Sequence, residues 1–184
     1  MTPKPKKCRI CKEPFLPRQP MQKVCGVECA RQEAVKVREK AERIADRTAR
    51  LNLKTRRELM AEAQTAFNAW VRARDADKPC ISCGRHHQGQ WHAGHYLSTG
   101  ARPELRFEPD NVHKQCQPCN THLHGNLVLY RLALIERIGL ERVELLEGPH
   151  DTQKLTAAEL RNIKTFYTQQ ARKLIRSGST EENT

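Results

Sequence analysis

Two short cysteine motifs, Cys80-Ile81-Ser82-Cys83 and Cys116-Gln117-Pro118-Cys119-Asn120, enclose one segment of the chain. Cysteines at C-x2-C spacing are typical ligands of a structural Zn²⁺ ion. One ion bound by both pairs would close the segment into a loop and bring His95, which lies inside it, beside Asn120. The sequence therefore predicts a fold organised by a zinc-closed loop that carries a histidine.

A second quartet near the start of the chain has the spacing C-x2-C-x13-C-x3-C and consists of Cys8, Cys11, Cys25 and Cys29. The prolines between its two pairs disfavour a continuous helix and suit a looped zinc knuckle. Disulfide bonds are the alternative for both quartets. However, residues 1–7 are rich in Pro and Lys, and no apolar run reaches the about 18 residues of a membrane span. We therefore expect two structural zinc sites, a cytosolic compartment and no membrane partner.

The apolar core is expected to be modest, because the 184 residues include only 5% aromatic residues and the mean hydropathy is −0.77. Each zinc-bound quartet would add roughly 10–16 kcal/mol of apparent binding energy to the folded state. We expect metal binding to supply much of the stability that apolar burial does not.

Positive charge is concentrated in the first third of the chain. Residues 1–57 hold 17 Lys and Arg against 6 Asp and Glu, a net charge of +11, whereas residues 58–184 hold 16 against 15. A basic block of this kind is attracted to a polyphosphate by counterion release, with strong salt dependence and little sequence specificity. A solvated arm that only aids solubility is the alternative.

Residues 30–51 contain no Gly or Pro and are predicted to form a helix. Small and apolar residues recur at the 3-4 spacing of a coiled-coil seam, at Ala34, Val37, Ala41, Ile44, Thr48 and Leu51. A neighbouring basic stripe, partly muted by the i,i+4 pairs Glu39–Arg43 and Asp46–Arg50, consists of Lys36, Lys40, Arg43, Arg47 and Arg50. The helix could therefore form a homodimer through the seam, with the basic stripe bound to DNA. The alternative is a single amphipathic helix that packs against its own domain.

The remaining pattern predicts a mostly helical α+β fold. A capping box at Thr55 begins a helix that runs towards Asp75, and another at Thr156 begins a final helix with a tail from Ser177. Strands are expected at 90–97 and 105–113, and short helices at 126–138 and 141–146. The expected segments are a zinc knuckle (1–30), a basic helix (31–54), a catalytic domain (55–150) and a C-terminal helix and tail (151–184).

His95 on the first strand would face Asn120 at the start of the helix after the second cysteine pair. A neutral imidazole and one divalent cation are sufficient to cleave a phosphodiester, because they remove a proton from water and neutralise the leaving oxygen. The candidates for holding the scissile phosphate are Arg102, Arg106 and Lys114, and the alternative is that these are solvated loop charges.

The order of these motifs resembles that of zinc-bearing HNH, or His-Me finger, nucleases, including endonuclease VII. It is most similar to the NinG/Rap recombination endonucleases of lambdoid phages. The similar stretches include Ala93-Gly94-His95-Tyr96, the run from Asn111 to Cys116, and Cys119-Asn120, and the resemblance covers nearly the whole chain.

The resemblance implies a ββα-metal core in which His95 is the general base and Asn120 binds a catalytic Mg²⁺ or Mn²⁺. It also implies that Asn111 of the catalytic motif ties the hairpin loop. Gly94 stands where many such sites place an acidic ligand. His92 or His124, at i+4 from Asn120 on the same helix face, could supply the missing ligand, with His113 and His122 as lesser candidates. Histidine suits Mn²⁺ better than Mg²⁺.

The expected function is a structure-selective DNA endonuclease that cleaves branched recombination intermediates, such as Holliday junctions and D-loops, by water attack. Its compartment would be the cytosol of a host bacterium if a phage encodes it, and no small-molecule substrate is expected. Two alternatives remain open: a non-catalytic zinc protein that binds DNA and aids recombination, and an HNH nuclease that cuts linear duplex or RNA.

Overall fold

A computed structural model describes residues 4–152 and 154–181. The chain divides into two compact units, with the boundary between Lys54 and Thr55. Each unit is described by itself.

The first unit consists of a small zinc-knuckle-like hairpin and one long helix. Strands β1 (Lys6–Lys7) and β2 (Pro14–Phe15) are antiparallel, and helix α1 spans Val27–Leu53. The predicted helix is therefore confirmed and begins three residues earlier, so that Cys29 lies in its first turn. Val37 and Ile44 of the predicted seam are 63% and 57% exposed, so the described residues of this unit do not cover the seam.

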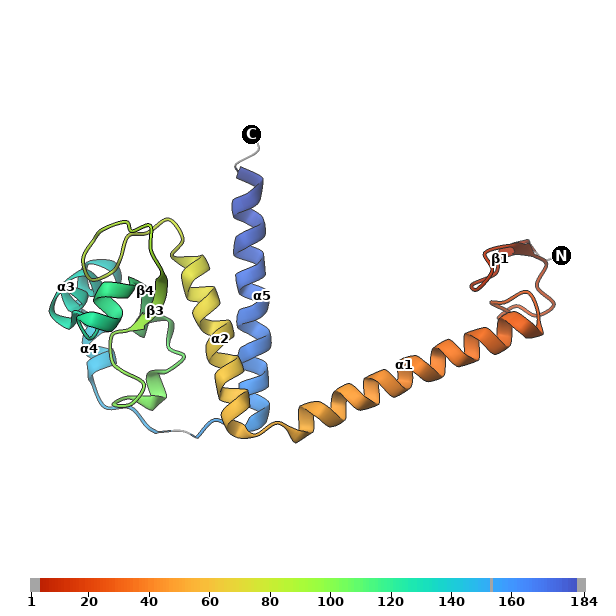
Figure 1. The fold of residues 1–184 in the computed structure, drawn as a ribbon, viewed down its shortest axis with the longest axis horizontal. Coiled ribbons are helices and arrows are strands. Elements are labelled where there is room, and N and C mark those ends of the chain that lie inside the picture. The colour runs from red at the N-terminus through yellow and green to blue at the C-terminus, as the bar shows by residue number, and fades with distance from the viewer. Residues whose placement is uncertain (1–3, 153, 182–184) are drawn as a thin grey trace. The chain divides into compact units, whose positions relative to one another are not determined.

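In the second unit, two capped helices lie side by side (Figure 1). Helix α2 (Arg56–Arg74) begins at the predicted capping box of Thr55, and helix α5 (Ala157–Glu181) follows Thr156, whose hydroxyl accepts from the amide of Glu159. The expected apolar face of α2 is buried: Leu59 and Ala63 pack on α5, and Phe67 meets Tyr167 with ring centroids 4.7 Å apart. Helix α5 continues past the expected start of the tail, and positions 182–184 lie outside the described residues.

A two-stranded hairpin packs against α2. Strand β3 (Trp91–His95) pairs antiparallel with β4 (Val112–Cys116), with Trp91 opposite Cys116 and His95 opposite Val112. The first strand agrees with the prediction, but the returning strand was wrongly placed at 105–113.

The error has a physical cause in the prolines of the loop between the strands. Pro103 and Pro109 each begin a 3₁₀ turn, η1 (Pro103–Leu105) and η2 (Pro109–Asn111). Proline fixes φ and has no amide hydrogen, so this stretch cannot donate a regular ladder of hydrogen bonds to β3. Pairing therefore starts only at Val112.

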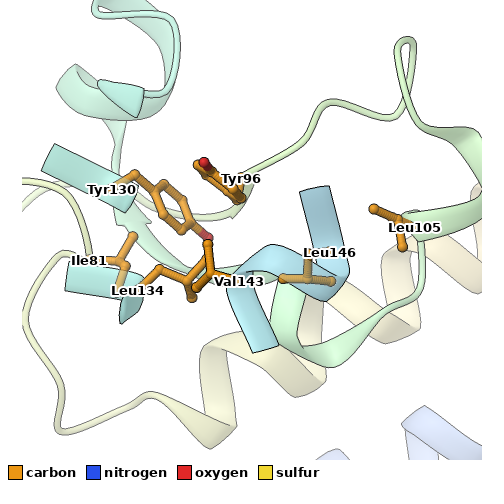
Figure 2. Packing of buried hydrophobic residues seen from close by; sticks show 7 residues of the cluster. All are labelled: Ile81, Tyr96, Leu105, Tyr130, Leu134, Val143 and Leu146. Atoms are coloured by element: carbon orange, nitrogen blue, oxygen red, sulfur yellow. The ribbon is translucent and has the colours of Figure 1, made fainter. Parts of the chain in front are cut away.

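Helices α3 (Leu127–Ile138) and α4 (Leu140–Glu147) follow the hairpin, close to the predicted ranges, and Gly139 between them has φ of +87°. Their apolar residues form a cluster with residues from the loop between the cysteine pairs (Figure 2). The cluster consists of Ile81, Tyr96, Leu105, Tyr130, Leu134, Val143 and Leu146. The hairpin thus lies between α2 on one face and α3 on the other, where the hydroxyl of Tyr130 donates to the Gly94 carbonyl.

The carboxylate of Asp75, just after α2, is fully buried and joins α2 to β4. It accepts hydrogen bonds from the guanidinium of Arg74, the ammonium of Lys78 and the backbone amide of Lys114. The hydrogen bonds and positive charge of Arg74 hold the pKa of Asp75 well below its usual range, despite the opposing effect of burial. This contact fixes the end of α2 against the strand that leads into the second cysteine pair.

None of the helices in the described ranges has a stretch both long and apolar enough to cross a lipid bilayer.

Candidate active site and metal centres

The cysteine pairs of the hairpin converge as predicted. The sulfur atoms of Cys80, Cys83, Cys116 and Cys119 all lie within 4.8 Å of one another, and none of them is in a disulfide. The backbone amide of Cys116 points to the sulfur of Cys80 at 3.4 Å. Four converging thiols with backbone amide support are a donor set that suits Zn²⁺, so this cluster could bind zinc and hold both ends of the loop.

The N-terminal quartet also converges. Cys8, Cys11, Cys25 and Cys29 bring their sulfur atoms within 4.8 Å of one another, again without a disulfide. A zinc ion bound there would join the first turn of α1 to the β1–β2 hairpin.

His95 lies half-buried at the end of β3, and its Nε2 is 3.0 Å from the carbonyl oxygen of Arg106. Because a carbonyl can only accept, this contact places the imidazole proton on Nε2 and leaves the lone pair on Nδ1. Burial lowers the pKa of His95 below its ordinary 6.5, and the Arg106 hydrogen bond opposes this only in part. At neutral pH His95 therefore carries no charge, and its Nδ1 can accept a proton.

Asn120 and His92 contact each other across the hairpin. Asn120 lies in a single π-helical turn, η3 (Pro118–His122), and its Nδ2 is 2.8 Å from His92 Nδ1. The residue before Asn120 is the last thiol of the cluster, so metal binding at the thiols would fix the position of Asn120 relative to the hairpin.

Gly94 has a steric reason to be glycine. A Cβ atom at this position would lie 2.1 Å from Oε1 of Gln115 and 3.0 Å from Oδ1 of Asn120. Gln115 is fully buried, and its Nε2 donates to Ser82 and to the Gly125 carbonyl. The space of an acidic side chain at position 94 is therefore already filled by two amide groups.

His95 was expected to face Asn120, but His95 lies on the opposite face of β3 from His92 and Asn120, because side chains alternate along a strand. His92 and Gly94 face Asn120, whereas Ala93 packs against Phe67 of α2 and His95 shares its face. In the described part of the chain β3 pairs only with β4, so its other edge is open. A group lying along this edge can reach both faces.

A polar pocket of about 460 Å³ lies along that edge. It is lined by the consecutive residues Gln90, Trp91, His92 and Ala93, by Asn120, and by Asn68 and Arg72 of α2. The sequence interpretation missed the two α2 residues. The signal that could have found them is the i,i+4 spacing of Gln64, Asn68 and Arg72 beside the apolar face of that helix.

His92 Nδ1 and the amide oxygen of Asn120 could bind a metal ion, and no carboxylate is among the described residues that line the pocket. This donor set suits Mn²⁺ better than Mg²⁺, which prefers oxygen ligands. An ion shared by the two side chains would replace their present hydrogen bond.

Asn111 braces the loop between the strands. It is fully buried, its Nδ2 donates to the carbonyls of Leu97 and Leu105, and its Oδ1 accepts from the Leu97 amide. Its side chain cannot touch a substrate and acts by holding the strand that carries His95.

The three predicted phosphate-binding residues of the hairpin are engaged elsewhere. Lys114 is 5% exposed, donates to the Ala76 carbonyl and lies over the ring of Trp91, so its ammonium is not placed to bind a phosphate. Arg102 donates to Glu104 and to the Gly148 carbonyl. Arg106 donates to Gln64 of α2 at 3.2 Å.

The other candidate histidines do not join the pocket. His124 was expected on the same helix face as Asn120, but the π-turn ends at His122 and His124 has φ of +49°, so the i+4 relation does not exist. His113 is buried against Tyr130, and its pKa falls to about 3 because of burial. Both His122 and His124 are exposed.

The predicted basic stripe of α1 is solvent-exposed along its whole length, at Lys36, Lys40, Arg43, Arg47 and Arg50. The expected pair Glu39–Arg43 is present with an N–O distance of 3.6 Å. The stripe therefore remains accessible to a polyanion.

Comparison with known proteins identifies relatives that span nearly the whole chain. The family model described as "NinG: Bacteriophage Lambda NinG protein" matches residues 1–177. Protein ninG of Escherichia phage 933W is 44% identical over 96% of this chain and 97% of its own length. Protein ninG of Salmonella phage P22 is 43% identical over 89% and 90%, and that of Escherichia phage lambda is 42% identical over 92% of each. No solved structure matches. With this extent of similarity, the chain belongs to the NinG family of lambdoid phage proteins.

Proposed function

We propose that the protein is a metal-dependent DNA endonuclease that cleaves branched recombination intermediates by water attack, in the cytosol of a host bacterium. The observation that carries the proposal is the contact between His95 Nε2 and the Arg106 carbonyl, which leaves Nδ1 free as a proton acceptor. The antiparallel pair β3–β4 followed by η3 is consistent with the ββα-metal arrangement that the motif resemblance implies.

His95 would act as the general base. Its lowered pKa keeps the imidazole neutral at working pH, so Nδ1 takes the proton of the attacking water. The imidazolium that forms keeps its Nε2 hydrogen bond to the Arg106 carbonyl, which holds the ring in place and stabilises the added charge. Attack on phosphorus then breaks the bond to the 3′ oxygen, which takes a proton from solvent water, leaving a 5′-phosphate and a 3′-hydroxyl, as the resemblance implies.

The metal would be held by His92 and Asn120, whose side chains meet beside the open edge of β3. When bound, a divalent ion supplies Lewis-acid activation of the phosphate and neutralises charge on the leaving oxygen. The Cα atoms of His92 and His95 are about 10 Å apart along an extended strand, so both side chains would have to turn towards the open edge of β3 to act on one phosphodiester.

Two further features support DNA as the substrate. The exposed basic stripe of α1 can follow a phosphate backbone, and the exposed seam that contains Val37 and Ile44 could pair two copies of the chain. A homodimer would present two cutting sites, which suits the resolution of a junction. The preference for branched DNA rests on the family resemblance.

The decisive experiment is a cleavage assay on a four-way junction, a linear duplex and an RNA duplex, with Mg²⁺, Mn²⁺ or chelator. We expect junction cutting by the wild-type protein with Mn²⁺, and retained binding without cutting for His95→Gln. Cutting that survives His95→Gln contradicts the assignment of the base. Binding without any cutting by the wild type favours the non-catalytic DNA-binding alternative, and a preference for unbranched duplex favours the linear-duplex alternative.

A further inference from the structure

The polar pocket beside β3 contains a positive charge without a carboxylate partner. Arg72 of α2 lines the pocket, and none of the ion pairs in the described part of the chain involves it. Arg74, two residues later, is fully engaged with Asp75 and with the carbonyls of Pro109 and Val112. Arg74 therefore stabilises the contact between α2 and the hairpin, whereas Arg72 faces the polar pocket.

Asn68, one turn earlier, is oriented by a neighbour. Gln64 Nε2 donates to Asn68 Oδ1 at 2.8 Å. The amide oxygen of Asn68 is thereby used within the helix, and its Nδ2 remains available as a donor in the pocket that Asn68 lines. Two donor groups, a guanidinium and an amide, thus lie one turn apart on the same helix face.

The same helix face is connected to the candidate base. Gln64 Oε1 accepts from the guanidinium of Arg106, and the carbonyl of Arg106 holds His95 Nε2. Hydrogen bonds therefore link Asn68 to Gln64 and Gln64 to the side chain of Arg106, whose backbone carbonyl contacts His95.

We propose that Arg72 and Asn68 bind the non-bridging oxygens of the scissile phosphate at the open edge of β3. The planar guanidinium donates two parallel hydrogen bonds to a phosphate, and the Asn68 amide donates a third. The pocket has a charge and a donor set that fit an anion, and His92 and Asn120 line the same pocket. The inference rests on the proposed function for the reaction, whereas the binding of a backbone phosphate rests on the pocket itself.

The test compares Arg72→Gln and Asn68→Asp with Arg57→Gln, which removes one exposed charge from the first turn of the same helix. With enzyme in excess over a labelled junction and Mn²⁺ present, we expect single-turnover cleavage to fall about 100-fold for Arg72→Gln, the usual effect of losing one transition-state donor. Asn68→Asp should reduce cleavage at least as much, because its carboxylate repels the phosphate. Arg57→Gln should stay within about three-fold of wild type, as expected for a surface charge distant from the reaction.

Arg72→Lys separates charge from geometry. A lysine keeps the positive charge but loses the planar fork, so we expect a rate between those of wild type and Arg72→Gln. If Arg72→Gln cuts as fast as Arg57→Gln, the proposal is overturned.

Failure of the proposed function would be recognised separately, because the wild type would then cut no substrate. In that case the dependence of DNA affinity on salt decides the inference. A slope of log K against log salt that is smaller by about one for Arg72→Gln than for wild type supports a phosphate contact, and an unchanged slope overturns it.

Discussion

One added methyl group at Gly94 is expected to lower the free energy of unfolding, because the space beside this residue is filled. Its Cβ would meet the buried amide of Gln115, which is held at Ser82 and Gly125 and cannot move freely. We expect Gly94→Ala to lower the free energy of unfolding by about 1–3 kcal/mol, the usual effect of overpacking. Urea denaturation of the metal-loaded protein measures this.

The matched control is Gly100→Ala, where an added Cβ meets only the Ser98 hydroxyl at 4.0 Å. Its free energy of unfolding should stay within about 0.5 kcal/mol of wild type. Equal stability of the two variants would show that the space beside Gly94 is not closed.

If His95 is the base of the proposed reaction, its pKa predicts the pH dependence of cleavage. Burial lowers this pKa below 6.5, so the ring loses its proton at a lower pH than an exposed histidine does. The rate should rise with pH, reach half its maximum below pH 6.5 and stay level through neutral pH. A profile of single-turnover rate against pH checks this, and a half-maximum above pH 7 contradicts the role of a buried neutral base.

At the scale of elements, the link between α2 and β4 depends on Asp75. Asp75→Asn would leave Arg74 and Lys78 without their buried carboxylate, and we expect a loss of about 3 kcal/mol in the free energy of unfolding. Asp77→Asn, an exposed neighbour, is the control. Urea denaturation at pH 7 measures both variants, and equal values would contradict the structural role of Asp75.

The pKa of Asp75 gives the sign of an accompanying pH effect. Because its pKa in the folded protein lies below its usual value, its contribution to stability is complete above about pH 5 and is lost as the pH falls through the folded pKa. Asp75→Asn should therefore lose less stability than wild type when the pH is lowered from 5 to 3.

Removal of zinc tests whether metal bound at the two cysteine quartets stabilises the loops that they close. A strong chelator should lower the melting temperature and unfold the hairpin between Cys80 and Cys116. The reason is that the free energy of metal binding at such sites contributes to the free energy of folding. Metal analysis of the purified protein should find two zinc ions per chain. A melting temperature that chelation does not change would contradict this.

The sequence predicted some elements well because their signals are local. The capping boxes at Thr55 and Thr156 and the glycine between α3 and α4 are read from a few adjacent residues. The second strand was misplaced because Pro109, inside the predicted range, begins a 3₁₀ turn, and a proline cannot donate to a regular ladder.

The candidate site was predicted only in part for a similar reason. Cysteine spacing predicted the thiol cluster and singled out His95 and Asn120, and the resemblance supplied the roles of base and metal ligand. The contribution of Arg72 was invisible, because a polar residue on a helix next to an apolar face looks like solvated surface until the strand edge is placed beside it. Likewise, nothing in the sequence around Lys114 predicts that its ammonium lies over the ring of Trp91.

At the scale of the whole molecule, charge and the candidate site reside in different units. The basic stripe lies before Lys54 and the polar pocket after Thr55. We expect the fragment 55–184 to keep its fold and to lose most of its DNA affinity and salt dependence, because the counterion-releasing residues are gone. Fluorescence anisotropy at several salt concentrations measures this for the fragment and the full chain.

Sedimentation of the same two proteins tests the α1 seam. If α1 pairs two copies, the full chain should sediment as a dimer and the fragment as a monomer. In the anisotropy experiment described above, an affinity for DNA that is the same for the fragment and the full chain would show that the basic stripe does not bind DNA.

The capping box at Thr55 means that α2 does not depend on a preceding helical turn to satisfy its first amide groups. Lys54 before it has extended backbone, so α1 and α2 are not one continuous rod. A foreign targeting module could therefore be grafted ahead of Thr55 without altering the chemistry behind it. Exchanging the segment before Thr55 would then change which DNA the protein binds and would leave the residues of the polar pocket unaltered.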